Sequence, residues 1–92
     1  MDNNIYNIMR AKLVISSITR NEDNGETLKM IAVSKFDGYG DDGLDENNTY
    51  AKFSPSADFE IYITNPALHG KFEPDQQYYA DFTLVAEKPT KI

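Results

Sequence analysis

Residues 10–36 read RAKLVISSITRNEDNGETLKMIAVSKF, and this stretch decides the fold. Apolar side chains alternate with polar ones on both sides of a polar segment at 21–26, which is typical of two strands that each bury one face. Within the polar segment, Asn24 and Gly25 are residue types that supply the positive φ of a tight turn. The stretch therefore predicts an antiparallel hairpin with strands at 10–20 and 27–36.

Each strand of this hairpin has one face suited to a hydrophobic core. The second strand also carries Ile31 and Val33 on its other face, which indicates that this face is partly covered as well. The residues expected to point inward are Ala11, Leu13, Ile15, Leu28, Met30 and Ala32.

Two further strands follow with the same period of two. Residues 58–64 place Phe59, Ile61 and Ile63 on one face, and residues 77–87 form the last strand. A short strand is also expected at 49–54, ended by Pro55. The inward residues of the last strand are Tyr78, Ala80, Phe82, Leu84 and Ala86.

The segment 65–70 predicts a single helical turn. Asn65 is a typical cap, Pro66 suits the first helical position, and Gly70 accepts a left-handed exit. Five strands and this one turn, in a chain of 92 residues, predict an all-β fold. We expect a small antiparallel five-stranded barrel or sandwich, OB-like or SH3-like, because closure removes exposed strand edges.

The length allows one domain. We expect residues 1–8 to be a polar lead-in, residues 9–88 to be a single β domain, and residues 89–92 to be a C-terminal tail. The start, Met1-Asp2-Asn3-Asn4, is acidic and polar where a secretory segment needs a basic lead. Because the chain also contains no cysteine, a cytoplasmic location is the expectation.

The composition excludes several classes of function. Without cysteine there is no disulfide, thiolate nucleophile or zinc–cysteine site. Nine basic against fifteen acidic residues give a net charge of −6, which disfavours a duplex-binding surface. Most of this excess comes from residues 37–48, which hold five carboxylates and no basic residue.

This acidic loop, residues 37–48, is the main candidate site. Its carboxylates and glycines suit a calcium ion in kind, but Asp42 stands where an EF-hand needs glycine, and Asn48 where it needs glutamate. We therefore predict no metal site and no cofactor. Three interpretations of the loop stay open: a solvated loop, a loop that binds a basic protein surface, and a divalent-ion site that does not follow the EF-hand pattern. The candidate partner-binding residues are Tyr39, Asp41, Asp42, Asp45 and Glu46.

The sequence offers little material for catalysis. His69 is the only histidine, and no serine occupies a strand–turn–helix elbow. Asp58 and Glu60 share one strand face, but no apolar pocket is implied that would raise the pKa of either. We predict a protein that is not an enzyme and has no catalytic residues.

Binding of single-stranded nucleic acid is an alternative. Tyr62 and Tyr79 lie on polar strand faces, where aromatic rings can stack on bases. The competing interpretation is that both form cross-strand pairs. The basic residues that could accompany them are Arg10, Lys12, Arg20, Lys29, Lys35 and Lys52.

Several short segments carry a resemblance to a known group of proteins. They are DENNTYAKFSPSAD at 45–58, Asn65-Pro66-Ala67, Gly70-Lys71-Phe72, YYADFT at 78–83, and the opening Met9-Arg10-Ala11-Lys12. Together they resemble small uncharacterised proteins of tailed bacteriophages and prophages, over about residues 9–85. Residues 1–8 and the end beyond Val85 depart from that pattern. The resemblance implies a phage source and expression in the bacterial host cytoplasm, and it brings no activity or site residues.

The leading hypothesis is a non-enzymatic phage accessory protein that binds a host or phage protein. Inhibition of a host defence or metabolic protein is one form that this binding would take. Two alternatives are a single-strand-binding factor in phage DNA metabolism and a self-assembling virion component whose strand edges pair between subunits. No membrane partner is expected, and the oligomeric state stays open.

Overall fold

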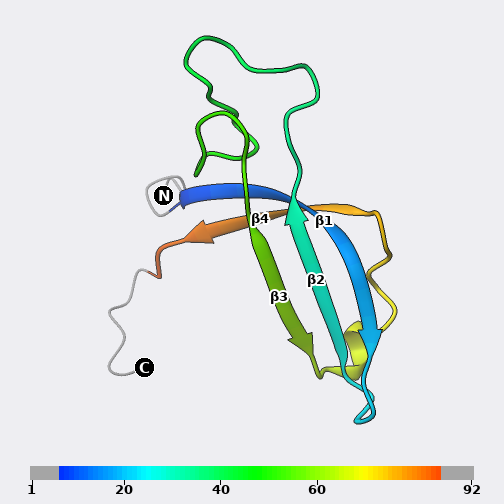
Figure 1. Cartoon of the computed structure of the whole chain (residues 1–92). Coiled ribbons are helices and arrows are strands. Elements are labelled where there is room, and N and C mark those ends of the chain that lie inside the picture. Colours follow the sequence, from blue (N-terminus) through cyan, green and yellow to red (C-terminus); the bar gives the residue numbers. More distant parts are fainter. Residues whose placement is uncertain (1–6, 86–92) are drawn as a thin grey trace.

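Four antiparallel strands form one sheet in residues 7–85, the part of the chain that the computed structural model describes (Figure 1). The sheet order is β3-β2-β1-β4, so β1 and β2 are central and β3 and β4 lie at the two edges. A 3-10 helix, η2, lies between β3 and β4. The elements are β1 (Asn7–Arg20), β2 (Glu26–Ala32), β3 (Asp58–Ile63), η2 (Pro66–Leu68) and β4 (Gln77–Thr83).

The sheet curls into a half-barrel and does not close. β1 is the longest strand, with 14 residues. It bends across the sheet and pairs with β2 along one edge and with β4 along the other (Figure 1). β3 and β4 do not pair with each other. The prediction of an antiparallel all-β fold is confirmed. The predicted fifth strand and the closed barrel or sandwich are not found in residues 7–85.

The predicted strand at 49–54 is wrong because turn geometry takes its place. The Ala51 N–H donates to the Asn48 carbonyl over 3.2 Å, which closes a local turn. Phe53 has a φ of 62°, which lies in the left-handed region that a regular strand excludes. Its N–H donates to the Gly43 carbonyl over 2.7 Å and so has no strand partner.

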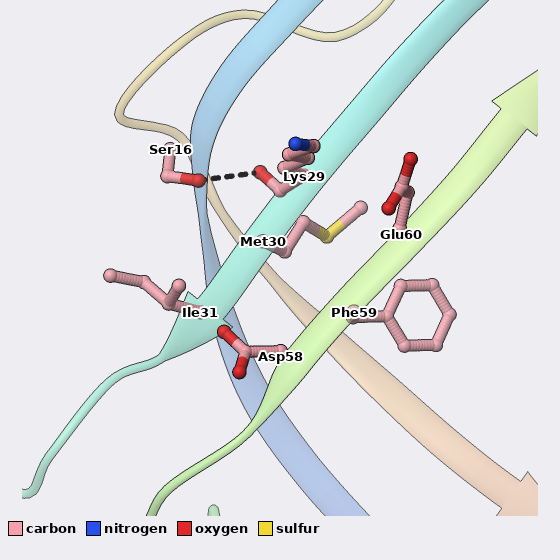
Figure 2. Close-up of a pocket in the computed structure, with 7 residues that line it drawn as sticks. All are labelled: Ser16, Lys29, Met30, Ile31, Asp58, Phe59 and Glu60. Carbon is pink, nitrogen blue, oxygen red and sulfur yellow. Dashed lines mark hydrogen bonds between the residues drawn. The ribbon is translucent and has the colours of Figure 1, made fainter.

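A β-bulge at Ser16 interrupts the alternation of side chains between the two faces of β1. The pairing runs Ile15↔Met30 and then Ser17↔Lys29, so Ser16 is an extra residue opposite β2. The Ser16 hydroxyl donates to the Lys29 carbonyl over 3.1 Å (Figure 2). Because of this extra residue, Ile18 pairs with Leu28 and shares a face with Ile15, whereas strict alternation would place it on the other face.

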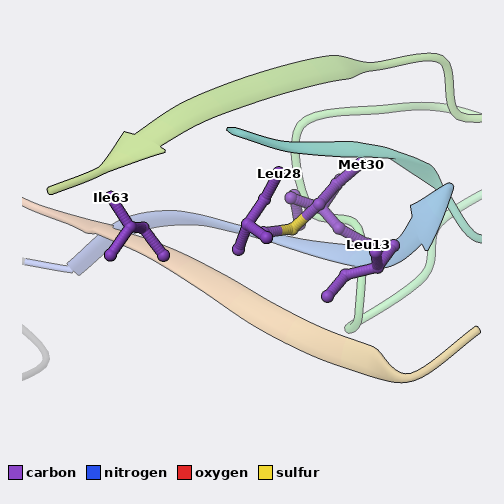
Figure 3. Packing of buried hydrophobic residues seen from close by; sticks show 6 residues of the cluster. Leu13, Leu28, Met30 and Ile63 are labelled. Carbon is purple, nitrogen blue, oxygen red and sulfur yellow. The ribbon is translucent and has the colours of Figure 1, made fainter. Parts of the chain in front are cut away.

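The hydrophobic core lies on one face of the sheet, which we call the inner face. Leu13, Ile15 and Leu28 are at most 2% exposed, and Figure 3 shows Leu13, Leu28, Met30 and Ile63 side by side. Ile61 and Phe82 also belong to this face by register but are 42% and 44% exposed. The core is therefore densest over β1 and β2 and thins toward both edge strands. Its fully buried members are Ala11, Leu13, Ile15, Leu28, Met30 and Ile63.

Strand ends differ from the predicted ranges. β1 begins at Asn7, so residues 7 and 8 of the predicted lead-in belong to the sheet. β2 ends at Ala32 and not at residue 36. The Val33 N–H still donates to the Lys12 carbonyl, but the Asn48 side chain replaces the second backbone hydrogen bond of that pair. β4 ends at Thr83, where the prediction ran to 87. Residues 1–6 and 86–92 lie outside the described residues; they include the predicted strand end at 86 and 87 and the predicted tail at 89–92.

The predicted turns are found, with one correction. Asn65 accepts from the Ala67 N–H over 3.0 Å, Pro66 opens η2, and Gly70 has a φ of +77°. In the hairpin turn, Asn24 alone has the positive φ, of 72°. Gly25 is needed for a different reason, since a Cβ there would lie 2.6 Å from a ring carbon of Tyr62. No helix within residues 7–85 has the length and apolar character needed to cross a membrane.

Candidate functional site

The chain between β2 and β3, residues 33–57, projects beyond the sheet from the end of β2 (Figure 1). We call these residues the lobe. They contain the predicted acidic loop at 37–48, and they hold no helix or strand. A projecting segment can reach a partner without obstruction from the sheet. Whether it can serve as a binding surface depends on the contacts that hold it in one conformation.

Asn48 and Thr49 fix the base of the lobe to β1. Beyond the end of β2, backbone groups of Arg10 and Lys12 face an edge with no strand beside it. The Asn48 side chain accepts from the Lys12 N–H over 2.9 Å and donates to the Val33 carbonyl over 2.8 Å. Thr49 donates to the Arg10 carbonyl over 3.0 Å and accepts from the Arg10 N–H through its hydroxyl over 2.8 Å. These two residues thus satisfy the backbone groups that a strand would otherwise pair.

Asp45 completes this base from inside the lobe. Asp45 is 5% exposed, and its carboxylate accepts hydrogen bonds from the Asn47 N–H over 2.9 Å and from the Asn48 side-chain amide over 3.1 Å. Burial by itself raises the pKa of Asp45, but these hydrogen bonds, with the charges of Lys35 and Lys12, outweigh burial and lower that pKa. Asp45 is therefore an ionised structural group.

Aromatic packing holds the outer part of the lobe. The Tyr39 ring meets Phe53 edge-on at 5.9 Å between centroids, and its hydroxyl accepts from the Lys35 N–H over 3.2 Å. Phe53 also lies against Gly43, where a Cβ would be 2.6 Å from the ring and where φ is +71°. Only glycine fits that position without strain. The lobe is consequently a folded unit with its own contacts.

The surface of the lobe combines three exposed large apolar side chains, Phe36, Leu44 and Phe53, with several carboxylates. Phe36 is fully exposed, with no covering contact, and Leu44 is 56% exposed. Phenylalanine is among the aromatic residue types that are enriched in the buried core of protein–protein interfaces. The carboxylates exposed on the same lobe belong to Asp37, Asp41, Asp42 and Glu46.

The structure divides the five predicted partner-binding residues into two groups. Asp41, Asp42 and Glu46 are exposed on the lobe and available to a partner. Tyr39 is half-buried against Phe53, and Asp45 is buried in the interior of the lobe, away from the surface that carries Asp41, Asp42 and Glu46. Pattern reasoning could not separate Asp45 from its neighbours because its burial depends on Asn48 reaching β1.

Sequence reasoning missed Phe36 as a surface residue. The predicted strand at 27–36 ends at Phe36, and an aromatic residue at the end of a strand would be expected to pack against the sheet. The available signal was its position directly before Asp37, at the start of the acidic run.

Both outer-face tyrosines are engaged within the sheet. Tyr79 donates to Asn47 over 2.8 Å, and the Arg10 guanidinium lies 4.1 Å above its ring. Arg10 also bonds Asp81 over 2.6 Å, and this hydrogen bond lowers the pKa of the Asp81 carboxyl. The Tyr62 hydroxyl donates to the Asp23 carboxylate. These contacts are the cross-strand and turn contacts of a stable outer face.

Two further titratable groups, His69 and Glu26, form hydrogen bonds within the protein at the end of the sheet away from the lobe. A ring nitrogen of His69 lies 3.1 Å from the Ile63 carbonyl. The buried carboxylate of Glu26 accepts from Arg20 over 3.2 Å and from the Gly70 N–H over 3.1 Å. Across residues 7–85, no three His, Asp or Glu side chains are grouped so that they could hold a metal ion.

Comparison of the chain with protein-family models, with curated proteins and with solved structures gave no match.

Proposed function

We propose that the chain is a non-enzymatic protein-binding module, a phage accessory protein that contacts its partner through the lobe. The observation that carries this proposal is the full exposure of Phe36 on the lobe that also carries the exposed carboxylates of Asp37, Asp41 and Asp42. An aromatic anchor with a charged surround is the composition of a protein-interface hot spot.

The two kinds of side chain have different tasks in this proposal. Phe36 enters an apolar pocket of the partner and supplies most of the affinity, because burial removes a whole aromatic side chain from water. The carboxylates of Asp41, Asp42 and Glu46 face basic residues and mainly raise the association rate. The expected partner surface is an apolar pocket rimmed by lysine and arginine.

The construction of the lobe supports a binding role. Asn48 and Thr49 fix its base, and the Tyr39–Phe53–Gly43 contacts fix its outer part. A surface that is already in its bound conformation loses less conformational entropy on association. The contacts within the lobe therefore lower the entropic cost of binding, which would be high for an irregular segment without such contacts.

The resemblance of residues 9–85 to phage proteins supports a partner in the cytoplasm of the bacterial host. We propose that the bound molecule is a host protein, of a defence or metabolic system, and that binding inhibits it.

The test is affinity capture followed by a binding measurement with the purified captured protein. The tagged chain is incubated with lysate of infected and uninfected bacteria, alongside Phe36→Ala and Asp41→Asn/Asp42→Asn variants. We expect Phe36→Ala to weaken binding by at least about 30-fold, since a hot-spot truncation costs about 2 kcal/mol or more. The double Asn variant should bind more slowly at low salt and lose most of the salt dependence.

Leu68→Ala is the matched control, because Leu68 is also an exposed apolar residue, at 44%, but lies on η2 at the other end of the sheet. It should bind like the parent chain. Equal affinity of the parent, Phe36→Ala and the double Asn variant for the captured protein would overturn the proposal.

A further inference from the structure

Among residues 7–85, no strand pairs with the outer edge of β3, and the backbone groups that face this edge can be assigned. The Ala32 N–H donates to the Ala57 carbonyl over 3.2 Å, immediately before the ladder begins. In an antiparallel ladder such bonded pairs recur at every second residue. The backbone groups of Phe59 and Ile61 therefore face β2, and those of Asp58, Glu60 and Tyr62 face away from it.

The side chains of this edge separate by chemistry. Phe59 and Ile61 lie on the inner face, where Ile61 is 42% exposed although it pairs with the fully buried Leu28. Asp58 and Glu60 lie on the outer face and are exposed. Of the three residues whose backbone N–H and C=O groups face away from β2, two therefore carry carboxylates, Asp58 and Glu60.

The outer face beside this edge is hollowed and acidic. A hollow of 390 Å³ is lined in part by Asp58, Glu60 and Lys29, which Figure 2 shows on neighbouring strands. A second hollow, of 590 Å³, shares Glu60 and continues past Tyr62 toward the hairpin turn. Lys29 is the single basic residue that lines either hollow. The carboxylates that line them are Glu22, Asp23, Asp58 and Glu60.

The inner face beside this edge is apolar. A pocket of 190 Å³ opens between the two edges of the half-barrel, with Phe59 and Phe82 on opposite sides and Met9 and Leu13 in its lining. Among residues 7–85 no strand bridges these two edges. An added strand at β3 would thus have an apolar surface on its inner side and carboxylates on its outer side.

We propose that the β3 edge binds an extended segment of a partner protein in which apolar residues alternate with lysine or arginine. The segment adds a strand to the sheet and bonds to the backbone groups of Asp58, Glu60 and Tyr62. Alternate side chains of a strand point to opposite faces, so its basic residues meet Asp58 and Glu60 while its apolar residues extend the surface of Phe59 and Ile61. This surface is separate from the lobe, and the inference does not rest on the function proposed for the lobe.

Charge complementarity selects such a partner over a second copy of the chain. Two copies joined along β3 would bring two identical acidic outer faces together, with Glu60 opposite Glu60 in one register and opposite Tyr62 in the next. In both registers Asp58, Glu60 and Asp23 of each copy would accumulate on one surface with few basic residues. Like charges across paired strands destabilise the pairing.

The test uses the isotopically labelled full chain and a capped synthetic peptide, Thr-Val-Lys-Val-Lys-Val-Thr, followed by NMR. We expect the amide resonances of Asp58, Glu60 and Tyr62 to shift. The same peptide with glutamate in place of lysine should bind at least about tenfold more weakly, because each opposed pair changes sign.

Variants assign the binding to the edge and to its charges. Glu60→Pro removes an outward N–H that β2 does not use, and it should abolish binding. Asp58→Asn/Glu60→Gln keeps the backbone intact, so it tests the charges even if the proline variant loses its fold. This double variant should bind about fivefold more weakly and with less salt dependence.

Gln77→Pro, at the first residue of β4, is the control for a proline at the other edge and should bind like the parent. Phe36→Ala should also leave peptide binding unchanged, which separates this surface from the lobe. Resonance shifts at β4 in place of β3, self-association of the chain through β3, or equal binding of the lysine and glutamate peptides would each overturn the proposal.

Discussion

At the scale of single residues, one asparagine decides how the lobe is attached. Asn48 is 1% exposed, and its amide forms hydrogen bonds with Lys12, Val33 and Asp45. A side-chain amide has a donor and an acceptor in the same plane, so it can stand in for the peptide group of an absent strand. Asn48 thus links the end of β2, the middle of β1 and the acidic segment.

We predict that Asn48→Ala lowers the free energy of unfolding by about 3 kcal/mol, because it leaves the part-buried Lys12 N–H and Val33 carbonyl without partners. Urea denaturation followed by circular dichroism measures this change. Asn47→Ala is the matched control, since Asn47 accepts at the surface from Tyr79, and it should cost less than about 1 kcal/mol. A similar loss in both variants would contradict the role given to Asn48.

At the scale of elements, the outer face of the sheet explains why exposed tyrosines need not imply nucleic-acid binding. Tyr79 from β4 lies under Arg10 from β1, and Arg10 is held by Asp81. Stacking on a base would require the guanidinium to leave that ring, and a phosphate would have to compete with the Asp81 carboxylate. At the other edge, the Tyr62 hydroxyl donates a hydrogen bond to Asp23, and this bond is the main cause of the lowered pKa of Asp23. Both ends of the face therefore carry a carboxylate beside the aromatic ring.

We accordingly predict that the chain does not bind single-stranded DNA. A fluorescence-anisotropy titration with labelled oligo-dT at low salt should show no binding up to tens of micromolar protein. Asp81→Asn is the informative variant, since it frees the Arg10 guanidinium and removes a repulsive charge. Low-micromolar binding by the parent chain, weakened by Tyr79→Ala, would instead support the single-strand-binding alternative.

At the scale of the whole molecule, stability rests on a sheet that buries one face only partly and on ionised carboxylates that fix its connections. The folded-state pKa values of Asp23, Asp45 and Asp81 are all lowered. A group whose pKa is lower in the folded than in the unfolded state contributes stability above its unfolded pKa, which for aspartate is about 3.9. That contribution is lost as the pH falls through the folded pKa.

The free energy of unfolding should therefore be nearly constant above about pH 5 and should decrease between about pH 4 and pH 2. Urea denaturation at a series of pH values tests this. The difference between the parent and Asp45→Asn should be largest at neutral pH and should shrink as the pH falls, since protonation removes the charge that the variant lacks. Asp41→Asn, at an exposed position, should follow the parent curve throughout. A constant difference between the parent and Asp45→Asn across the range would contradict the structural role of the Asp45 charge.

The predictable part of this molecule was local. Alternation gave the four strands that are present, the hairpin between β1 and β2, and the capped turn at Asn65 and Pro66, because these depend on residues close in the chain. The acidic segment and most of its exposed carboxylates were also visible as composition. The exposure of Phe36 and the burial of Asp45 were not predictable, since both depend on how the lobe meets the sheet.

The sequence by itself determined an antiparallel β fold, its strand faces and its concentrated acidic segment. Only the tertiary structure decided that the segment at 49–54 is a turn fixed to β1, that Ser16 shifts the phase of β1, and that β3 and β4 remain unjoined. The physical reason is the range of the interactions. Propensity and alternation act between neighbours, whereas the bonds from Asn48 to Lys12 and the register around Ser16 join residues far apart in the chain and can form only once the sheet exists.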